Sequence, residues 1–449
     1  MKQHFQRNGI LVGMMGRRGG QGRWLAWAAA GLALLVLAAC TSVPLEEPAP
    51  VDAGDRPAAA DQPLTVPPLS ALPETPVRPL QGQYVAVSWD SLPGWTEDDL
   101  SHVWKALLND CRGLMRPVSG SLTLPARAAP RAWQPVCQAA VQSGLGPQSS
   151  GPAVRKFLQD QLRPWRLDDG TGRPAAGTLT GYYEPLIRAA RTRQGVYQWP
   201  LYAPPADLLT IDLGAVYPEL AGKRVRGKLE GRRVVPYDTR AQITSDPARQ
   251  PAVIVWADDP VEAFFLQIQG SGRAVLPDGS VLRLAYADHN GRPYASIGQW
   301  LARQGEMPLA STSMQNIKAW ARAHPQRVPE LLNVNPAMVF FREEPIDDPE
   351  LGPRGAYGVP LLPRRAIAVD PAYVPLGTPV FLESGTQGGA VPMRRLVFAQ
   401  DTGAAIKGAA RADFYWGTGD EAGARAGRMK QSSRMWLLWP ARAGAPSAR

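Results

Sequence analysis

Prolines and glycines interrupt this chain so often that few long helices can form. Among its 449 residues there are 45 prolines and 44 glycines. Proline removes a backbone donor and glycine weakens regular elements, so short elements joined by many turns are expected. Hydrophobic residues at 45% and charged residues at 20% are ordinary globular values. The length exceeds one compact core and predicts a targeting segment plus two domains, or one domain inserted into another.

The first segment has the pattern of a bacterial lipoprotein signal. Basic residues precede an apolar stretch at residues 24–39, which is short for a membrane span and ends in LAAC at residues 37–40. This ending predicts cleavage before Cys40 and acylation of Cys40, which would tether the chain to lipid. Because Thr41 follows, and not an aspartate, we expect the periplasmic face of the outer membrane. An uncleaved signal anchor is the alternative.

The net charge of +10 does not indicate nucleic-acid binding. Half of it comes from the signal, which holds five basic residues and no acid: Lys2, Arg7, Arg17, Arg18 and Arg23. The remaining charge forms no run long enough to follow a phosphate backbone. We therefore expect no nucleic-acid partner.

Residues 41–80 are rich in proline, alanine and acids and have too few large apolar residues to fold. We expect a linker that extends on the order of 100 Å at about 3.1 Å per residue. Folded sequence is expected to begin near Gln81. The small, polar residues 441–449 are expected to be a frayed tail.

Cysteine usage agrees with an oxidising compartment. With Cys40 acylated, Cys111 and Cys137 remain, and we predict a disulfide between them. Closing this loop would contribute roughly 3 kcal/mol on a chain-entropy argument. Two buried free thiols are the alternative.

Apolar periodicity predicts N-terminal helices followed by mainly β structure. Thr96 is a predicted helix N-cap, and apolar residues at helical spacing follow it as far as Cys111. Further helices are predicted at residues 135–143, 153–162, 296–304 and 313–324. Strands are predicted at residues 84–89, 177–183, 253–256, 264–269 and 281–286, with a third β-rich stretch at 339–439.

Several kinds of chemistry lack their residues. The four histidines, His4, His102, His289 and His324, show no metal-ligand spacing, so we expect no metal. The glycines around Ser271 fit no nucleophile elbow, and no dinucleotide or phosphate loop is present, so we expect no cofactor. Carboxylates remain, and these suit the cleavage of glycosidic or peptide bonds.

Three aspartates end or interrupt apolar runs in the C-terminal β stretch: Asp370, Asp401 and Asp413. Alternation over residues 411–417 (RADFYWG) places Asp413 and Tyr415 on one face of a strand, and Trp416 on the other, in the core. A single aspartate after a strand is usually a turn cap. Three so close together indicate a site.

The surrounding motifs resemble a known family. Residues 357–361 (YGVPL), 368–371 (AVDP), 374–378 (VPLGT), 399–408 (AQDTGAAIKG) and 411–413 (RAD) resemble the three-aspartate, or 3D, domain. Residues 179–185 (LTGYYEP), 264–272 (FFLQIQGSG) and 335–341 (NPAMVFF) resemble the membrane-bound lytic murein transglycosylase A family. The resemblance runs in order over residues 81–440.

This resemblance implies a double-psi β-barrel, built from both ends of the folded chain, with a second β domain inserted. The implied division is residues 1–39 signal peptide, 40–80 lipidated cysteine and linker, 81–182 first part of the barrel domain with helices, 183–336 inserted β domain, 337–440 second part of the barrel domain, and 441–449 tail. Ala404 departs from the family, which usually has glycine there.

The resemblance also implies the reaction and its residues. The family cleaves the β-1,4 bond between N-acetylmuramic acid and N-acetylglucosamine in peptidoglycan and leaves a 1,6-anhydromuramoyl end. Its catalytic aspartate matches Asp413, with Asp401 and Asp370 as companions. Since the muramoyl C6 hydroxyl attacks, one carboxyl can act as acid and then as base, provided that its pKa is raised.

Sugar-binding groups are expected around these carboxyls. Aromatic faces and hydroxyls suit sugar rings, amides and hydroxyls suit hydrogen bonding, and a cation suits an anionic lactyl or peptide carboxylate. The candidates are Thr180, Tyr182, Tyr183, Gln269, Ser271, Asp370, Lys407 and Tyr415.

Two other functions remain open on the sequence. The barrel could bind peptidoglycan without cutting it, or it could be an inverting hydrolase with Glu184 or Glu421 activating water. The expected partners are glycan strands, outer-membrane lipid through acylated Cys40, and cell-wall synthesis or division proteins.

Overall fold

The computed structural model describes residues 63–74, 79–116, 126–213, 216–217, 225–385, 392–403 and 405–448. The predicted signal, Cys40, the first part of the linker and Ala404 lie outside these residues. Within the described ranges, no helix combines the length and the apolar character that a bilayer crossing requires.

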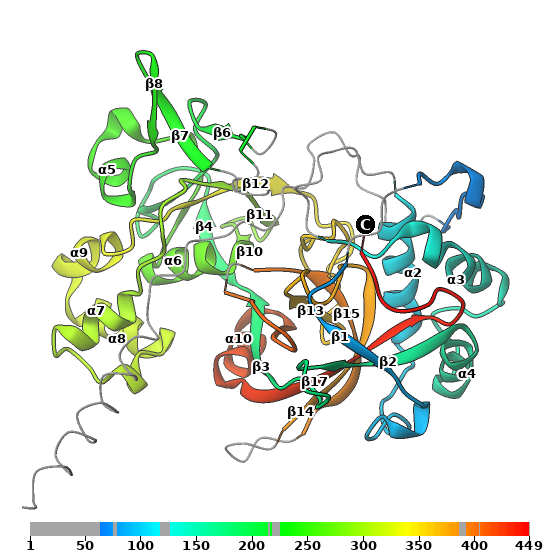
Figure 1. The fold of residues 1–449 in the computed structure, drawn as a ribbon. Coiled ribbons are helices and arrows are strands. Elements are labelled where there is room, and N and C mark those ends of the chain that lie inside the picture. The colour runs from blue at the N-terminus through cyan, green and yellow to red at the C-terminus, as the bar shows by residue number, and fades with distance from the viewer. Residues whose placement is uncertain are drawn as a thin grey trace, which may run out of the picture. The chain divides into compact units, whose positions relative to one another are not determined.

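The larger sheet takes its strands from both ends of the folded chain (Figure 1). Its order is β1-β2-β17-β14-β15-β13-β16-β3, and β17 pairs additionally with β3. The strands are β1 Gln83–Ala86, β2 Leu162–Asp168, β3 Gly177–Glu184, β13 Ala366–Val369, β14 Thr378–Ser384, β15 Arg394–Asp401, β16 Ala412–Thr418 and β17 Lys430–Pro440. Strands β13 and β14 are buried along their whole length, because other elements cover both of their faces.

Three helices, α2 Val103–Met115, α3 Pro130–Gln142 and α4 Gly151–Gln161, share the apolar core of this sheet. Trp133 of α3 meets Trp439 of β17 edge to face at 5.8 Å between ring centroids. The disulfide forms between Cys111 of α2 and Cys137 of α3, the pairing that the sequence predicted.

The start of α2 was predicted wrongly. Thr96 is not its N-cap, since the helix begins at Val103 and residues 94–98 form turns. Buried Asp98 pairs with Arg365 at 2.8 Å and accepts the Leu396 amide at 2.8 Å, so long-range bonds hold this segment away from helical geometry.

The middle of the chain forms a second sheet of order β12-β11-β10-β4-β9-β5 and a small sheet β6-β7-β8. Their strands are β4 Leu186–Ala190, β5 Trp199–Tyr202, β6 Leu209–Ile211, β7 Val225–Glu230, β8 Arg233–Pro236, β9 Val253–Ala257, β10 Gly272–Val275, β11 Val281–His289 and β12 Val339–Glu344. The remaining α-helices of the described chain are α5 Arg240–Ser245, α6 Pro260–Gln269, α7 Ile297–Arg303, α8 Met314–Ala323, α9 Val328–Asn333 and α10 Gly419–Arg428.

The predicted strands at residues 177–183, 253–256 and 281–286 are confirmed as β3, β9 and β11. The predicted strand at residues 264–269 is wrong, because this run is the end of helix α6. Asp259 caps that helix by accepting from two backbone amides, and Gly270 ends it with a φ of 78°. The C-terminal tail is not frayed throughout, since Ala448 is fully buried and bridges to Ala128.

Candidate active site

Strand pairing brings two of the three aspartates onto one row of the larger sheet. Asp413 of β16 lies opposite Ala368 of β13 and Thr180 of β3, while Ala368 also pairs with Asp401 of β15. Residues in register on neighbouring strands point to the same face. The two aspartates are therefore separated by one strand, and their backbones lie about 9–10 Å apart at the usual strand spacing.

Asp413 lies in an environment that favours the protonated form of its carboxyl. The Thr180 hydroxyl donates to its Oδ1 at 2.7 Å. Burial raises the pKa of Asp413 from 3.8 to about 6; the Thr180 bond and the charge of Arg411 oppose this shift, and the charge of Asp401 adds to it. Such a group can donate a proton and later accept one.

Asp401 is held in place by three donors. Tyr182 donates its hydroxyl to Oδ2 at 3.0 Å, and the amides of Ala356 and Thr402 each donate to Oδ1 at 2.9 Å. Burial raises the pKa of Asp401, although all three bonds lower it. This carboxyl is fixed and satisfied, and it orients Tyr182.

A close backbone approach makes the Ala356 bond possible. A Cβ at the preceding Gly355 would lie 2.4 Å from the Gln400 carbonyl oxygen, a distance that no side chain tolerates. Glycine at this position therefore lets the residue 355–356 backbone reach Asp401.

Three other predicted sugar-binding residues, Tyr183, Gln269 and Ser271, form a second group that lies away from the aspartate row. Successive residues of a strand face opposite sides, so Tyr183 points away from the side that carries Thr180 and Tyr182. The Tyr183 amide donates to Gln269 Oε1 at 3.5 Å, and its hydroxyl lies 3.7 Å from Met314 Sδ. Ser271 follows between α6 and β10.

Two predicted sugar-binding residues have structural roles instead. Tyr415 is fully buried, with its ring 5.2 Å from that of Tyr182, so no sugar reaches it. Asp370 accepts from the amides of Ala372 at 3.1 Å and Gly408 at 2.8 Å, and it is 8% exposed. Its carboxylate holds together the loop that contains Lys407.

The two acids proposed for water activation do not approach this row. Glu184 is fully buried between Arg273 at 2.8 Å and Arg283 at 2.9 Å, and it accepts the Thr418 hydroxyl at 2.8 Å. Glu421 is exposed in the first turn of α10 and pairs with Arg425 at 2.6 Å.

Trp416 is partly buried against the core, as expected.

The sequence analysis missed a buried carboxyl next to this site. Asp110 of α2 accepts, through Oδ1, from the side-chain Nε2 of Gln400 at 3.1 Å, and Gln400 directly precedes Asp401 in the chain. The other oxygen of Asp110 has no partner among the described residues. Burial raises the pKa of Asp110 from 3.8 to about 7, against the effect of the Gln400 bond. The sequence feature that could have indicated Asp110 is an acidic residue among the apolar positions of a predicted helix.

Asp110 should make the protein less stable as the pH rises. Because its pKa is higher in the folded chain, the unfolded chain releases this proton between about pH 4 and pH 7 while the folded chain retains it, which favours unfolding. Asp110→Asn should therefore remove a slope of up to about 1.4 kcal/mol per pH unit from the free energy of unfolding. Urea titrations at several pH values check this, with exposed Asp160→Asn on α4 as the control. Equal slopes in both variants would refute it.

The described residues contain no group of three or more His, Cys, Asp or Glu side chains arranged to hold a metal ion.

Comparisons with known proteins place this chain in a family. Family models match at residues 178–342, the MltA specific insert domain, and at 365–439, the 3D domain. The membrane-bound lytic murein transglycosylase A of Escherichia coli (strain K12) is 33% identical over 298 residues, 64% of this chain and 72% of that protein. The crystal structure of MltA from Neisseria gonorrhoeae has a TM-score of 0.69 at 32% identity, covering 87% of this chain and 99% of that one. E. coli MltA with bound chitohexaose has a TM-score of 0.55 at 26% identity, covering 83% and 93%.

These matches define a chain with an MltA-type insert domain and a 3D domain. Asp401 and Asp413 lie in the segment that matches the 3D domain, and Thr180 lies at the start of the segment that matches the insert domain. The chain belongs to the membrane-bound lytic murein transglycosylase A family.

Proposed function

We propose that this chain is a lytic transglycosylase that cleaves the β-1,4 bond between N-acetylmuramic acid and N-acetylglucosamine in peptidoglycan. The observation that carries the proposal is Asp413, a carboxyl with a pKa of about 6, bonded to Thr180 and one strand away from fixed Asp401. The family membership and the chitohexaose bound to an E. coli relative support a glycan substrate.

The proposed reaction needs one carboxyl. Protonated Asp413 donates its proton to the glycosidic oxygen as the bond from that oxygen to the muramoyl C1 breaks. The muramoyl C6 oxygen then bonds to C1, and its proton passes to the Asp413 carboxylate, which restores the starting state. The attacking group belongs to the substrate, so no bound water is required. Asp401 helps to keep Asp413 protonated through its negative charge and orients Tyr182.

A hydrolase or a simple binding module fits the contacts less well. Buried Glu184 is committed to two arginines, and Glu421 to Arg425, so neither is placed to activate water beside Asp413. Binding alone does not require a carboxyl whose pKa is raised toward neutrality, whereas an acid catalyst does.

Sugar contacts are proposed for both groups of polar residues. Thr180 and Tyr182 lie beside the carboxyls, and Tyr183, Gln269 and Ser271 extend the surface from the inserted part. Exposed Lys407 is proposed to meet an anionic lactyl or peptide carboxylate.

The double-psi β-barrel and the location at the outer membrane are also proposed. Pairing of β17 with both β14 and β3 joins β17, β14, β15, β13, β16 and β3 in a ring, which supports the double-psi barrel and its assembly from residues 81–182 and 337–440. The expected start of folded sequence near Gln81 is wrong, because Leu72 is buried and its carbonyl accepts from Arg131 of α3 at 2.9 Å. Acylation of Cys40 at the periplasmic face of the outer membrane is supported by the lipobox pattern at residues 37–40 and by the name of the membrane-bound relatives. Partners among cell-wall synthesis or division proteins stay a prediction.

Mass spectrometry of the products of sacculus digestion tests the proposed reaction. Each muropeptide released should be lighter by one water, about 18 mass units, than the product of hydrolysis, because its muramoyl end is a 1,6-anhydro ring. Ordinary reducing ends would identify a hydrolase, and intact sacculi would identify a binding module.

The pH profile should show Asp413 acting first as an acid. Activity at low substrate should fall about tenfold per pH unit above pH 6, as the reactive proton is lost. Thr180→Val removes a bond that favours the ionised form, so the falling limb should move up by about one pH unit. Release of soluble muropeptides between pH 4.5 and 8.5 measures this, with Thr178→Val on the same strand as control. An unmoved limb in Thr180→Val would contradict this assignment of the limb to Asp413.

A further inference from the structure

The small sheet β6-β7-β8 carries its apolar side chains outward and its charged side chains inward. Period-two alternation along β7 places Val225 and Leu229 on one face and Arg226 and Lys228 on the other. Leu229 pairs across to Val234 of β8, so the apolar face continues on that strand.

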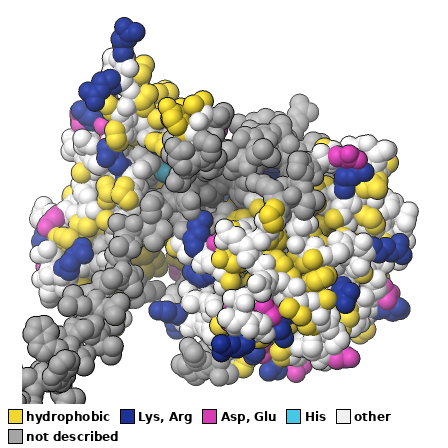
Figure 2. Space-filling model, viewed as in Figure 1, with side chains coloured by type: hydrophobic (Ala, Val, Ile, Leu, Met, Phe, Trp, Pro, Cys, Tyr) yellow, Lys and Arg dark blue, Asp and Glu magenta, His cyan; other side chains and the backbone are white. Residues whose placement is uncertain are grey.

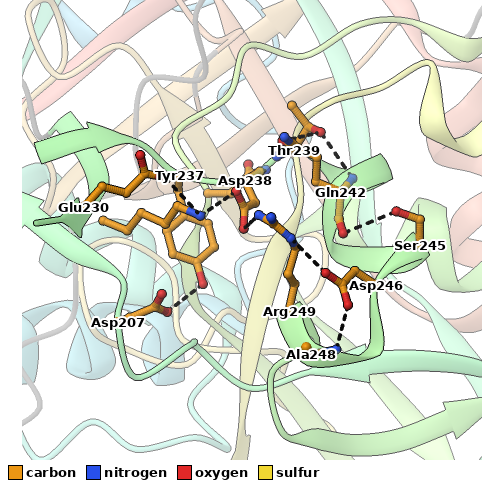
Figure 3. Close-up of polar contacts among 12 residues, drawn as sticks. Asp207, Glu230, Tyr237, Asp238, Thr239, Gln242, Ser245, Asp246, Ala248 and Arg249 are labelled. Atoms are coloured by element: carbon orange, nitrogen blue, oxygen red, sulfur yellow. Dashed lines mark hydrogen bonds and ion pairs between the residues drawn. The ribbon is translucent and has the colours of Figure 1, made fainter.

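Ion pairs fix the inward face against the rest of the inserted part. Arg226 bonds Asp288 at 2.7 Å. Lys228 bonds Asp238 at 2.8 Å, and Arg249 bonds the same carboxylate at 3.0 Å (Figure 3). These bonds set which face of the sheet points outward, so the exposed apolar face is not the result of a free hairpin turning over.

The outward face remains open in the structure. Leu229 is 61% exposed, Val234 50%, Val225 48% and Leu209 of β6 37%. The strands β7 and β8 form the far end of the inserted part (Figure 1), and apolar side chains gather along them below basic ones at the tip (Figure 2). These side chains lie on one face of neighbouring strands, so they form a candidate contact surface.

The turn of the hairpin adds positive charge at the edge of this face. Arg232 is exposed in the turn, and no ion pair joins it to an acidic side chain among the described residues. Arg233 lies in register with Glu230, so alternation places it on the opposite face. The exposed side chains of the outward face are aliphatic, and such groups neither stack on nor hydrogen-bond sugars, so a glycan subsite is a poor match. Aliphatic side chains beside an arginine match the boundary between acyl chains and anionic headgroups.

We propose that the outward face of β6-β7-β8, with Arg232 at its edge, docks on the surface of a bilayer that contains anionic phospholipid. The proposal goes beyond the glycan-cleaving site and draws only on the proposed acylation of Cys40. Residues 41–62 between that cysteine and the described chain reach about 70 Å when extended, so the anchor keeps the face near a bilayer at high effective concentration. Such a second contact would set the orientation of the active site at the membrane.

Hydrogen exchange on the full-length chain in vesicles tests the docking. Three samples are compared: phosphatidylethanolamine with phosphatidylglycerol, phosphatidylcholine alone, and detergent. Amides of residues 225–236 should exchange more slowly on the anionic vesicles than in the other two samples. Arg232→Gln should weaken docking about fivefold, whereas Arg233→Gln, on the opposite face, should weaken it less. Leu229→Ser with Val234→Ser should abolish the protection. Leu309→Ser and Arg322→Gln, exposed side chains elsewhere, should change nothing.

Two results would overturn the docking: equal exchange in all three samples, or slowing that depends on protein concentration and not on lipid, which would indicate a second copy. Intact mass reports acylation separately, and unacylated chain is compared with and without added vesicles. Because none of these residues lies at the aspartate row, the variants should digest sacculi in solution at the wild-type rate. Failure of the docking is thus distinguishable from failure of the proposed reaction.

Discussion

Asp413→Asn should lower the rate of muropeptide release by about a thousandfold. The amide cannot donate a proton to the glycosidic oxygen or take one from the C6 hydroxyl, and general acid–base catalysis of this kind contributes roughly 10²–10⁴ in rate. Asparagine keeps the shape of the side chain and can still accept the Thr180 hydroxyl, so the fold should persist. The measurement is release of soluble fragments from purified sacculi, followed over time at pH 5.5.

Two comparisons make this result specific. Asp160→Asn removes an exposed carboxylate on α4 and should leave the rate unchanged. Thermal unfolding of Asp413→Asn should show an intact fold, so that lost activity is not lost structure. Digestion by Asp413→Asn within tenfold of the wild-type rate would rule out Asp413 as the acid.

Glu184→Ala should destabilise the folded chain by about 3–5 kcal/mol. The substitution leaves the guanidinium groups of Arg273 and Arg283 buried without their carboxylate, and an uncompensated buried charge costs about this much. It also removes the bond to Thr418 of β16. Urea unfolding followed by fluorescence measures the change.

The matched control is Glu343→Ala, which breaks an ion pair with Arg191 in which both side chains are about half exposed. Solvent screens such a pair, so the change in the free energy of unfolding should stay within about 1 kcal/mol. If both variants lost a similar amount of free energy of unfolding, burial of the Glu184 cluster would not be what determines its contribution to stability.

The Glu184 cluster also bears on the active site. Glu184 ends β3, two residues after Tyr182, and both arginines donate to the Leu351 carbonyl, at 2.8 Å and 2.7 Å. The cluster thus joins the strand that carries Thr180 and Tyr182 to the six-stranded sheet. A destabilised Glu184→Ala chain should therefore lose part of its activity, because Tyr182 is positioned by the same strand.

Local patterns predicted much of the architecture, because they depend on a few neighbouring residues. The spacing of apolar residues predicted α2 and α8, and the alternation over residues 411–417 correctly placed Asp413 on a strand. Two local errors came from capping. The apolar run 264–269 was predicted as a strand, although Pro260 and Gly270 bound a helix there. Thr96 was predicted as the cap of α2, but the ion pair of Asp98 with Arg365 holds this segment outside the helix.

The sequence by itself determined which residues are available for chemistry: Cys111 and Cys137 for a disulfide, and three aspartates in the C-terminal β stretch. Only the tertiary structure decided how they act. Thr180 donates to Asp413 because strands from distant parts of the chain pair in one register. Packing of helix α2 against β15 brings Asp110 to the Gln400 side chain, and packing around β16 buries Tyr415. A pKa near 6 arises from the burial of Asp413, and burial depends on the whole packed fold and not on neighbours in sequence.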